Sequence, residues 1–325
     1  MELRVFLDVQ WSPEMLRHLE SLLLKEVTIL PDSSSADCDV LVSGRPDADL
    51  IARSSRLTHL LLPWAGLPRS TRLLMMDHPH ISVHNIHHNA DSAAELALGL
   101  MIAAARLIIP ADRELRKGDW SWRYRQEGRL LICGSAVLIL GYGHIGSRVG
   151  RAARALGASV TGIRRSAVSE TVEDGVRILP AASLHRLLPY TDVLVLTLPL
   201  TDDTVGIIGE QELGLLHEKS VLVNIGRGGL VDEDALYRSL SSGSIGAAGI
   251  DVWYRYPESE DERTCTPPSR HDLASLDNIV MTPHMGGGFG TEALERERAR
   301  QIAGSINALA SCGSMPFRVD LSAGY

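Results

Sequence analysis

The chain has 325 residues, of which 45% are hydrophobic and 22% charged, the composition of a folded globular protein long enough for two domains. Its formal net charge of -8 argues against a nucleic-acid backbone as the main partner. The amino terminus lacks the apolar run of a secretory signal, and the longest apolar stretch, residues 96–109, is too short to span a membrane. Because the four cysteines lie far apart without a C-x-x-C pair, we expect a cytoplasmic protein with neither a zinc site nor a disulfide framework.

Short β-branched strands alternate with helical segments along the chain, a pattern typical of parallel sheets joined by crossover helices. The expected strands of the first part cover residues 4–7, 27–30, 39–42, 57–62 and 81–85, and those of the second part cover residues 135–140, 158–163, 192–198, 220–225, 246–252 and 278–282. The sequence therefore predicts an α/β protein with two doubly wound parallel-sheet domains.

The domain boundaries are expected near two irregular stretches. A helix from Ser92 is predicted to end at Pro110, and the polar segment 116–134 follows it before the next strand. The last helix, residues 291–311, is followed by no further α/β repeat and is expected to return to the first domain. We assign residues 1–108 and 286–325 to a substrate-binding domain and residues 109–285 to a dinucleotide-binding domain.

Residues 141–146, GYGHIG, place three glycines in the G-x-G-x-x-G spacing between an apolar strand and a helix. In such a turn Gly141 permits the tight bend, Gly143 admits a pyrophosphate to the backbone, and Gly146 allows the helix to pack on the strand. The first helical residues, His144 and Ile145, add unpaired N–H groups and the positive end of the helix dipole. This stretch predicts a dinucleotide site without a metal.

The next strand ends at Arg164, Arg165 and Ser166. NAD-binding units usually carry an acidic residue at this position, about 20 residues after the glycines, where it binds the ribose 2′-hydroxyl. Two arginines and a hydroxyl would instead bind a 2′-phosphate through charge-assisted hydrogen bonds. We therefore expect NADP as the cofactor, with NAD as the alternative if both arginines are only solvated surface charges.

Three polar residues follow strands of the second part, at the strand ends where open α/β sheets bind their ligands. Arg227 lies among glycines and could bind a carboxylate bidentately while it polarises a neighbouring carbonyl. His284 could give a proton to an oxygen that becomes an alkoxide when hydride arrives. Together with Asp251, these residues are the candidates for chemistry.

Seven stretches, in this order, resemble the D-2-hydroxyacid dehydrogenase family, which includes glyoxylate and hydroxypyruvate reductases and phosphoglycerate dehydrogenase. They are residues 89–106, 140–146, 197–209, 224–236, 249–253, 282–287 and 317–325. The resemblance implies a Rossmann cofactor domain, a flavodoxin-like substrate domain, and a homodimer built with the helix from Ser92. It also implies nicotinamide-dependent reduction of a small 2-oxo acid, or the reverse oxidation.

The resemblance further implies a role for each matching residue. Arg227 would bind the carboxylate and carbonyl of the substrate, and His284 would be the acid/base. The remaining implied contacts are Leu198 and Pro199 with the adenosine, Thr204 with the cofactor, Asn224, Ile225 and Asp251 on the nicotinamide side, and the backbone N–H groups of Trp64, Ala65 and Gly66 with the substrate carboxylate.

The chain departs from the family at two places. The family normally has a glutamate five residues after Asp251, where this chain has Tyr256. Since a nearby anion favours the imidazolium, we expect His284 to lose its proton at lower pH than usual. Glu258 could replace the anion if its loop turns inward, although a surface position is favoured. His87 and His88 stand where Pro-Gly is common, and we interpret them as loop packing or substrate contacts rather than metal ligands.

We expect hydride transfer from NADPH or NADH to a small 2-oxo acid, giving a D-2-hydroxy acid, in a site formed by both domains. One alternative is a catalytically weak NADP(H)-binding regulator or scaffold, which the missing glutamate favours. Another is a dehydrogenase of formate or phosphite with the same fold. Neither a nucleic acid nor a membrane is an expected partner.

Overall fold

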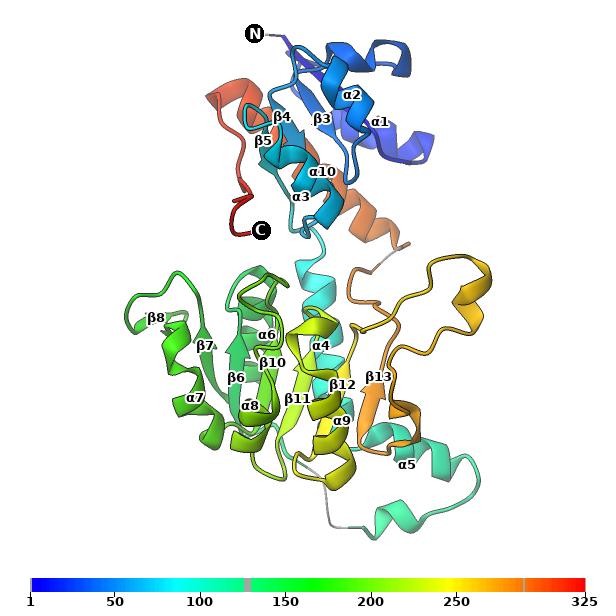
Figure 1. Cartoon of the computed structure of the whole chain (residues 1–325), viewed down its shortest axis with the longest axis vertical. Helices are drawn as coiled ribbons and strands as arrows, with labels where there is room; N and C mark the ends of the chain where they lie inside the picture. The colour runs from blue at the N-terminus through cyan, green and yellow to red at the C-terminus, as the bar shows by residue number, and fades with distance from the viewer. Residues whose placement is uncertain (1, 126–129, 289, 325) are drawn as a thin grey trace. The chain divides into compact units, whose positions relative to one another are not determined.

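The computed structural model describes residues 2–125, 130–288 and 290–324, so part of the predicted linker, residues 126–129, lies outside the described residues. The chain divides into two compact units (Figure 1). The first comprises Met1–Asn89 and Gly288–Tyr325, and the second comprises Ala90–Gly287. The boundaries differ from those expected at 108 and 285, because the helix that begins at Ala90 packs on the sheet of the second unit.

The first unit is built on a five-stranded parallel sheet with the order β2-β1-β3-β4-β5. Its strands are β1 (Leu3–Leu7), β2 (Val27–Ile29), β3 (Val40–Val42), β4 (His59–Leu61) and β5 (Ser82–His84), and its helices are α1 (Pro13–Leu22), α2 (Ala48–Arg53), α3 (Arg69–Met76), α10 (Glu292–Cys312) and the 3₁₀ segment η1 (Asp32–Asp37). This is the flavodoxin-like order that the resemblance implies. Ala299, Ile302 and Ile306 of α10 share one core with Val5 and Val40, so the last helix belongs to the first unit, as expected.

The second unit is built on an eight-stranded sheet with the order β13-β12-β11-β10-β6-β7-β9-β8. Its strands are β6 (Ala136–Leu140), β7 (Ser159–Ile163), β8 (Thr171–Glu173), β9 (Val176–Leu179), β10 (Val193–Leu196), β11 (Val221–Asn224), β12 (Ala247–Ile250) and β13 (Ile279–Met281). All neighbouring strands are parallel except β8 and β9. The strand order reverses between β6 and β10, the position where doubly wound sheets bind their ligands.

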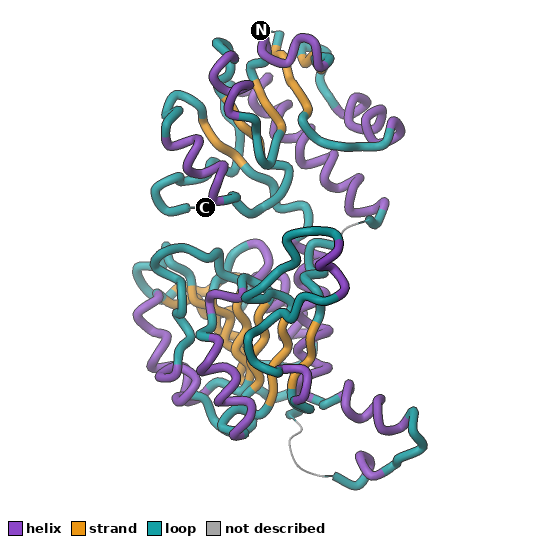
Figure 2. Tube along the Cα trace, turned by 45° about the vertical axis from the view of Figure 1, so that its right-hand side comes forward, coloured by secondary structure: helices purple, strands orange, loops and turns teal. Residues whose placement is uncertain are grey.

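Helices cover both faces of this second sheet (Figure 2). They are α4 (Ala90–Ala105), α5 (Ile108–Leu115), α6 (His144–Ala155), α7 (Leu184–Leu187), α8 (Glu210–Leu215) and α9 (Glu233–Ser242), with 3₁₀ segments η2 (Ser121–Arg123), η3 (Ala181–Ser183), η4 (Leu188–Tyr190), η5 (Gly228–Leu230), η6 (Asp261–Thr264) and η7 (Leu273–Ser275). Val137 and Ile139 of β6 lie in the core beneath α4 and α6, whereas Leu138 and Leu140 lie in the core of the opposite face. Because the strand is buried on both sides, it reads as a continuous apolar run.

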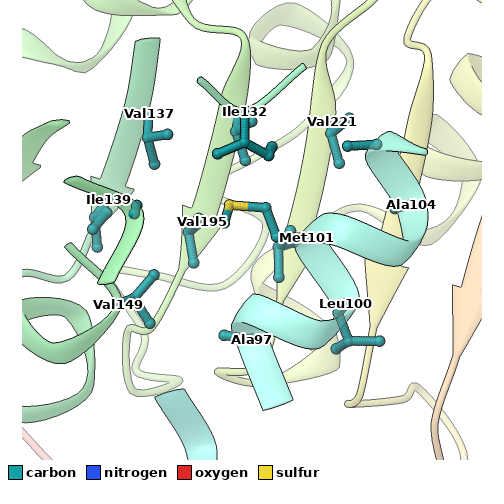
Figure 3. Packing of buried hydrophobic residues seen from close by; sticks show 14 of the residues in the cluster. Ala97, Leu100, Met101, Ala104, Ile132, Val137, Ile139, Val149, Val195 and Val221 are labelled. Atoms are coloured by element: carbon teal, nitrogen blue, oxygen red, sulfur yellow. The ribbon is translucent and has the colours of Figure 1, made fainter. Parts of the chain in front are cut away.

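The small residues of α4 allow it to lie close to the sheet. Figure 3 shows Ala97, Leu100, Met101 and Ala104 of this helix packed against valines of the strands. A Cβ on Gly249 of β12 would lie 2.8 Å from the Cβ of Leu100, so the helix could not approach a larger residue this closely. The burial of α4 against the second sheet explains why the unit begins before the predicted boundary.

The predicted end of the helix from Ser92 at Pro110 was wrong. Helix α4 ends at Ala105, Leu107 turns the chain with φ 51°, and Pro110 lies in the first turn of α5, where a missing N–H costs no helical hydrogen bond. Among the described residues, no single helix is long and apolar enough to cross a membrane, and α4 with α5 passes that test only as a pair bent by 65°.

Candidate active site

The glycine turn joins β6 to α6, and each glycine has its own geometric reason. Gly141 has φ 102°, in the left-handed region where a side chain is strained. A Cβ on Gly146 would lie 2.6 Å from the carbonyl oxygen of Gly141, so only glycine lets the helix approach the turn. A Cβ on Gly143 would meet nothing within 4 Å, so the turn is open at its middle glycine. A tight bend, an open middle position and close helix packing are the three roles that glycines have in a pyrophosphate-binding turn.

Helix α6 begins without a side-chain cap. Its N-cap residue, Gly143, is exposed and has no side chain that could accept from the N–H groups of the first turn. An anion can therefore approach these donors at the positive end of the helix dipole. Partial loss of hydration, and then the charge of Arg148, lower the pKa of His144. The residues present fit the phosphates of a dinucleotide.

The basic stretch after β7 contains a contact that the sequence analysis did not anticipate. Nη1 and Nη2 of Arg164 donate to the two carboxylate oxygens of Glu173, each at 2.6 Å, and Nε donates to the carbonyl of Tyr142 at 2.8 Å. Arg165 and Ser166 are exposed in the turn that follows. One of the two arginines expected to bind a 2′-phosphate is thus paired with a carboxylate of the chain itself.

The loop after β10 lies between the glycine turn and the segment after β11. A Cβ on Gly141 would lie 3.0 Å from the backbone nitrogen of Leu198, and a Cβ on Gly226 would lie 2.7 Å from its carbonyl oxygen. Oγ1 of Thr204 donates to the carbonyl of Pro199 at 2.8 Å and closes the rest of this loop on itself. The expected cofactor residues from these three segments therefore lie side by side within the second unit.

The segment that carries Arg227 is fixed by its neighbours. Nδ2 of Asn224 donates to the carbonyl of Arg227 at 2.9 Å, and its Oδ1 accepts from the N–H two residues along at 3.1 Å. A Cβ on Gly228 would lie 2.3 Å from the carbonyl oxygen of Trp253, so no other residue fits there. Ile225 is buried in the core beneath. The backbone from which the guanidinium projects is therefore held on both sides.

The turn that carries His284 is held by a buried carboxylate. Asp251 is 1% exposed, and its Oδ1 accepts from the hydroxyl of Thr282 at 2.6 Å and from the N–H of Met285 at 2.7 Å. Its Oδ2 accepts from the N–H of Gly286 at 2.9 Å. His284 itself has φ 57°, a conformation that costs free energy for a residue other than glycine. The three bonds on either side of it stabilise this backbone.

Arg227, Tyr256 and His284 lie together within the second unit, and we call them the arginine–histidine cluster. The ring centroids of Tyr256 and His284 are 5.6 Å apart, and the phenol oxygen accepts from the N–H of Trp253 at 3.0 Å. The charge of Arg227 acts on both Tyr256 and His284. Among the described residues, no carboxylate pairs with the guanidinium, which donates from Nη1 to the carbonyl of Gly226 at 2.7 Å.

The electrostatics of the cluster favour the neutral imidazole. Partial loss of hydration, and then the positive charge of Arg227, lower the pKa of His284, while Asp251 opposes the shift. Partial burial raises the pKa of Tyr256, so the phenol is neutral near pH 7. Glu258 is exposed, and within the described chain its backbone N–H bonds to Glu262 while its carboxylate makes no bond to His284. The pKa of His284 is lowered, which is the direction expected when the family's glutamate is absent.

In the first unit, the predicted substrate loop follows β4. A Cβ on Gly44 would lie 1.8 Å from a ring carbon of Trp64, so the indole lies directly on this glycine. Nδ2 of Asn85 donates to the carbonyl of Ala65 at 2.7 Å and fixes the loop before Gly66. The indole borders a hollow of about 260 Å³, which is also lined by Asp8, Val9, Gln10, Ser43, Gly44, Arg45 and Arg298.

Two of the three histidines near this loop have hydrogen-bond partners in the first unit. Nδ1 of His84 lies 2.8 Å from the carbonyl oxygen of Pro316, and the N–H of His87 donates to Gln301 at 2.9 Å. His88 is buried, and burial lowers its pKa to about 4. In residues 2–125, 130–288 and 290–324, no three side chains of His, Cys, Asp or Glu gather that could hold a metal ion.

The second unit also matches a known family model. The model described as D-isomer specific 2-hydroxyacid dehydrogenase, NAD binding domain, matches residues 98–286, more than half of the chain. The chain belongs to the D-2-hydroxyacid dehydrogenase family. The chain is 32% identical to the glyoxylate reductase of Aeropyrum pernix over 306 residues, which cover 86% of this chain and 85% of that protein.

Two further proteins are similar in sequence or in structure. The chain is 34% identical to the D-3-phosphoglycerate dehydrogenase of Methanocaldococcus jannaschii over 84% of its own length, but it spans only about half of that protein (49%). The NADPH-dependent glyoxylate/hydroxypyruvate reductase of Sinorhizobium meliloti, solved with NADP and sulfate, has a TM-score of 0.78 and 25% identity, and the match covers 99% of this chain and 100% of that one. The predicted fold class and family are therefore confirmed.

Proposed function

We propose that this chain reduces small 2-oxo acids to D-2-hydroxy acids with NADPH. The observation that carries the proposal is the grouping of Arg227 and His284 in the same unit as an open glycine turn. The chain's relatives in Aeropyrum pernix and Sinorhizobium meliloti are named as reductases of glyoxylate, and the second also of hydroxypyruvate. The grouping of these residues and the names of the relatives support the same class of reaction.

Arg227, His284 and Asp251 have separate roles in the proposed reduction. When bound, the nicotinamide would supply the hydride for the carbonyl carbon. Arg227 binds the substrate carboxylate through two parallel hydrogen bonds from its guanidinium, and it stabilises the negative charge that develops on the carbonyl oxygen. His284, protonated, gives its proton to that oxygen, so that the carbonyl group gains one hydride and one proton. Asp251 acts through His284 as a positioning residue, because its carboxylate fixes the turn on which the imidazole is carried.

The remaining assignments follow the resemblance. We propose that the open turn from Gly141 to Gly146 binds the pyrophosphate, and that Arg164, Arg165 and Ser166 bind the 2′-phosphate of NADP. The Sinorhizobium meliloti enzyme was solved with NADP, which agrees with this choice over NAD. The backbone N–H groups of Trp64, Ala65 and Gly66 are proposed to bind the carboxylate of the acid.

Replacing Tyr256 with glutamate is expected to move the alkaline limb of the pH profile of kcat/KM to higher pH, by about one unit. Reduction requires protonated His284, so activity is present below the pKa of this residue and is lost as the pH rises through it. The pKa is lowered in the chain as it stands, and a new anion would raise it. Steady-state NADPH oxidation between pH 5 and 9 measures the limb. Tyr256→Gln adds no charge and should leave the limb in place, and an unmoved limb in Tyr256→Glu would contradict this account.

The proposed reaction is tested by a substrate panel with both cofactors. NADPH oxidation is followed with glyoxylate, hydroxypyruvate and bulkier 2-oxo acids, and NADP reduction is followed with formate and phosphite. We expect turnover with at least one 2-oxo acid and higher efficiency with NADPH than with NADH. Tight NADPH binding without turnover would instead indicate a regulator, and turnover only with formate or phosphite would indicate the other dehydrogenase class.

We also propose a cytoplasmic homodimer. Ile108, Ile109 and Leu115 of α5 and Trp120 after it are exposed apolar side chains, and a second copy of the chain is the partner that the family resemblance implies. Cys38, Cys133, Cys265 and Cys312 are unpaired, which agrees with a reducing compartment. Sedimentation velocity of the whole chain, compared with a variant carrying Ile109→Asp, measures the assembly.

A further inference from the structure

Glu173 and the carbonyl of Tyr142 together engage both faces of the Arg164 guanidinium that could hold a phosphate with two hydrogen bonds. Nη1 and Nη2 form the end face, and both donate to Glu173 at 2.6 Å. Nε and Nη2 form the side face, and Nε already donates to the carbonyl of Tyr142 at 2.8 Å. An arginine binds carboxylates and phosphates through the same two faces. Arg164 cannot bind a phosphate in this way unless it releases a partner.

A tight hairpin brings Glu173 to this place. Strands β8 and β9 are antiparallel, with Glu173 opposite Val176, and the two residues between them, Asp174 and Gly175, have φ 48° and 74°. Positive φ at both positions is the mark of a two-residue hairpin turn, for which Asp-Gly is a preferred sequence. The hairpin closes the edge of the sheet next to β7, the strand that ends at Arg164.

We propose that Glu173 determines cofactor specificity, as an internal anion that competes with the 2′-phosphate of NADP for Arg164. The inference rests on the proposed use of NADP. The carboxylate occupies the donors that the phosphate needs, and its charge repels a phosphate that approaches. NAD lacks the 2′-phosphate and is not opposed in this way. Glu173 therefore reduces the preference for NADP that the two arginines create.

The test compares two substitutions that remove the same charge from neighbouring places. Glu173→Gln frees Arg164 from its ionic partner. Glu170→Gln is the matched control, because Glu170 forms a similar pair with Arg177, at 2.7 and 3.1 Å, and does not contact Arg164. Calorimetry with the whole chain measures the affinity for adenosine 2′,5′-bisphosphate and for adenosine 5′-monophosphate, which differ by the 2′-phosphate alone. The melting temperatures of both variants check that the fold is retained.

We expect Glu173→Gln to bind the bisphosphate about three- to tenfold more tightly. The exposed ion pair no longer lowers the fraction of molecules in which Arg164 is free to bind the 2′-phosphate. The affinity for the monophosphate should not change in this variant, and neither affinity should change in Glu170→Gln. In an Arg164→Met background, Glu173→Gln should produce a smaller gain, since only the repulsion between the carboxylate and the phosphate is then removed.

The possible failures separate the inference from the function on which it rests. If the wild type prefers the bisphosphate and Glu173→Gln leaves this preference unchanged or weakens it, the competition is refuted while the use of NADP stands. If the wild type binds the bisphosphate and the monophosphate equally tightly and Glu173→Gln binds the bisphosphate more tightly, the competition is supported. If the wild type and Glu173→Gln each bind the two nucleotides equally tightly, the proposed use of NADP fails and the competition fails with it.

Discussion

Replacing Arg227 with glutamine is expected to lower kcat/KM for reduction of a 2-oxo acid by about a thousandfold. The guanidinium is the cation of the arginine–histidine cluster, and no carboxylate of the described chain neutralises it. Glutamine can donate to the substrate but carries no charge, so both binding of the carboxylate and stabilisation of the growing alkoxide are lost. Steady-state kinetics with NADPH and the best acid of the panel measure the effect.

Two controls make the result specific to this arginine. Arg255→Gln removes the same charge from an exposed position of the same unit and should change kcat/KM little. Arg227→Lys keeps the charge but loses the two-pronged geometry, so we expect it to recover only part of the activity. NADPH affinity should be retained in all three variants. Near-normal kcat/KM in Arg227→Gln would mean that the substrate carboxylate binds elsewhere.

Replacing His284 with asparagine is expected to lower kcat by about a hundred- to ten-thousandfold, because a proton donor for the carbonyl oxygen is lost. Asparagine suits the test because it tolerates the left-handed backbone, and His284 has φ 57°. The turn held by Asp251 should therefore keep its shape. The pH profile gives a second readout, since the remaining activity should no longer fall as the pH rises through the range of a histidine.

His185→Asn is the matched control for that substitution. His185 is exposed and bonds to Glu212 at 2.7 Å, so its loss should leave kcat nearly unchanged. If kcat of His284→Asn stayed within about threefold of the wild type, a smaller loss than general acid catalysis usually gives, the proton would have to come from another group, and the assignment of His284 would be wrong.

Local sequence patterns predict much of the scaffold, because they depend on neighbouring residues. All eleven expected strands are present, since a buried parallel strand appears as a short apolar run. The hairpin of β8 and β9 was missed because Thr171–Glu173 is exposed and the exposed Arg177 interrupts the buried run Val176–Leu179, although Asp174-Gly175 marks its turn. The helix break at Leu107 was also missed, because the apolar pattern continues through it and only the backbone turns.

The local sequence indicates the candidate site residues but not the partners that hold them. The glycine spacing and the strand ends pointed to the turn, Arg227 and His284, because the turn begins, and each of the two residues lies, within three residues of the end of a strand. The partners of these residues depend on distant parts of the chain. Asp251 holds backbone N–H groups 34 and 35 residues away, and Glu173 reaches Arg164 only because a hairpin reverses the chain. Such pairings depend on tertiary structure, and no single stretch of sequence contains them.

The indole of Trp64 lying on Gly44 has a consequence for protein engineering. Any side chain added at position 44 must displace the indole, and a smaller residue at position 64 leaves a gap above the glycine that a larger residue could fill. The two positions are therefore coupled, and mutating either one alone samples mostly poorly packed variants. Libraries that vary the proposed substrate loop should randomise both codons together.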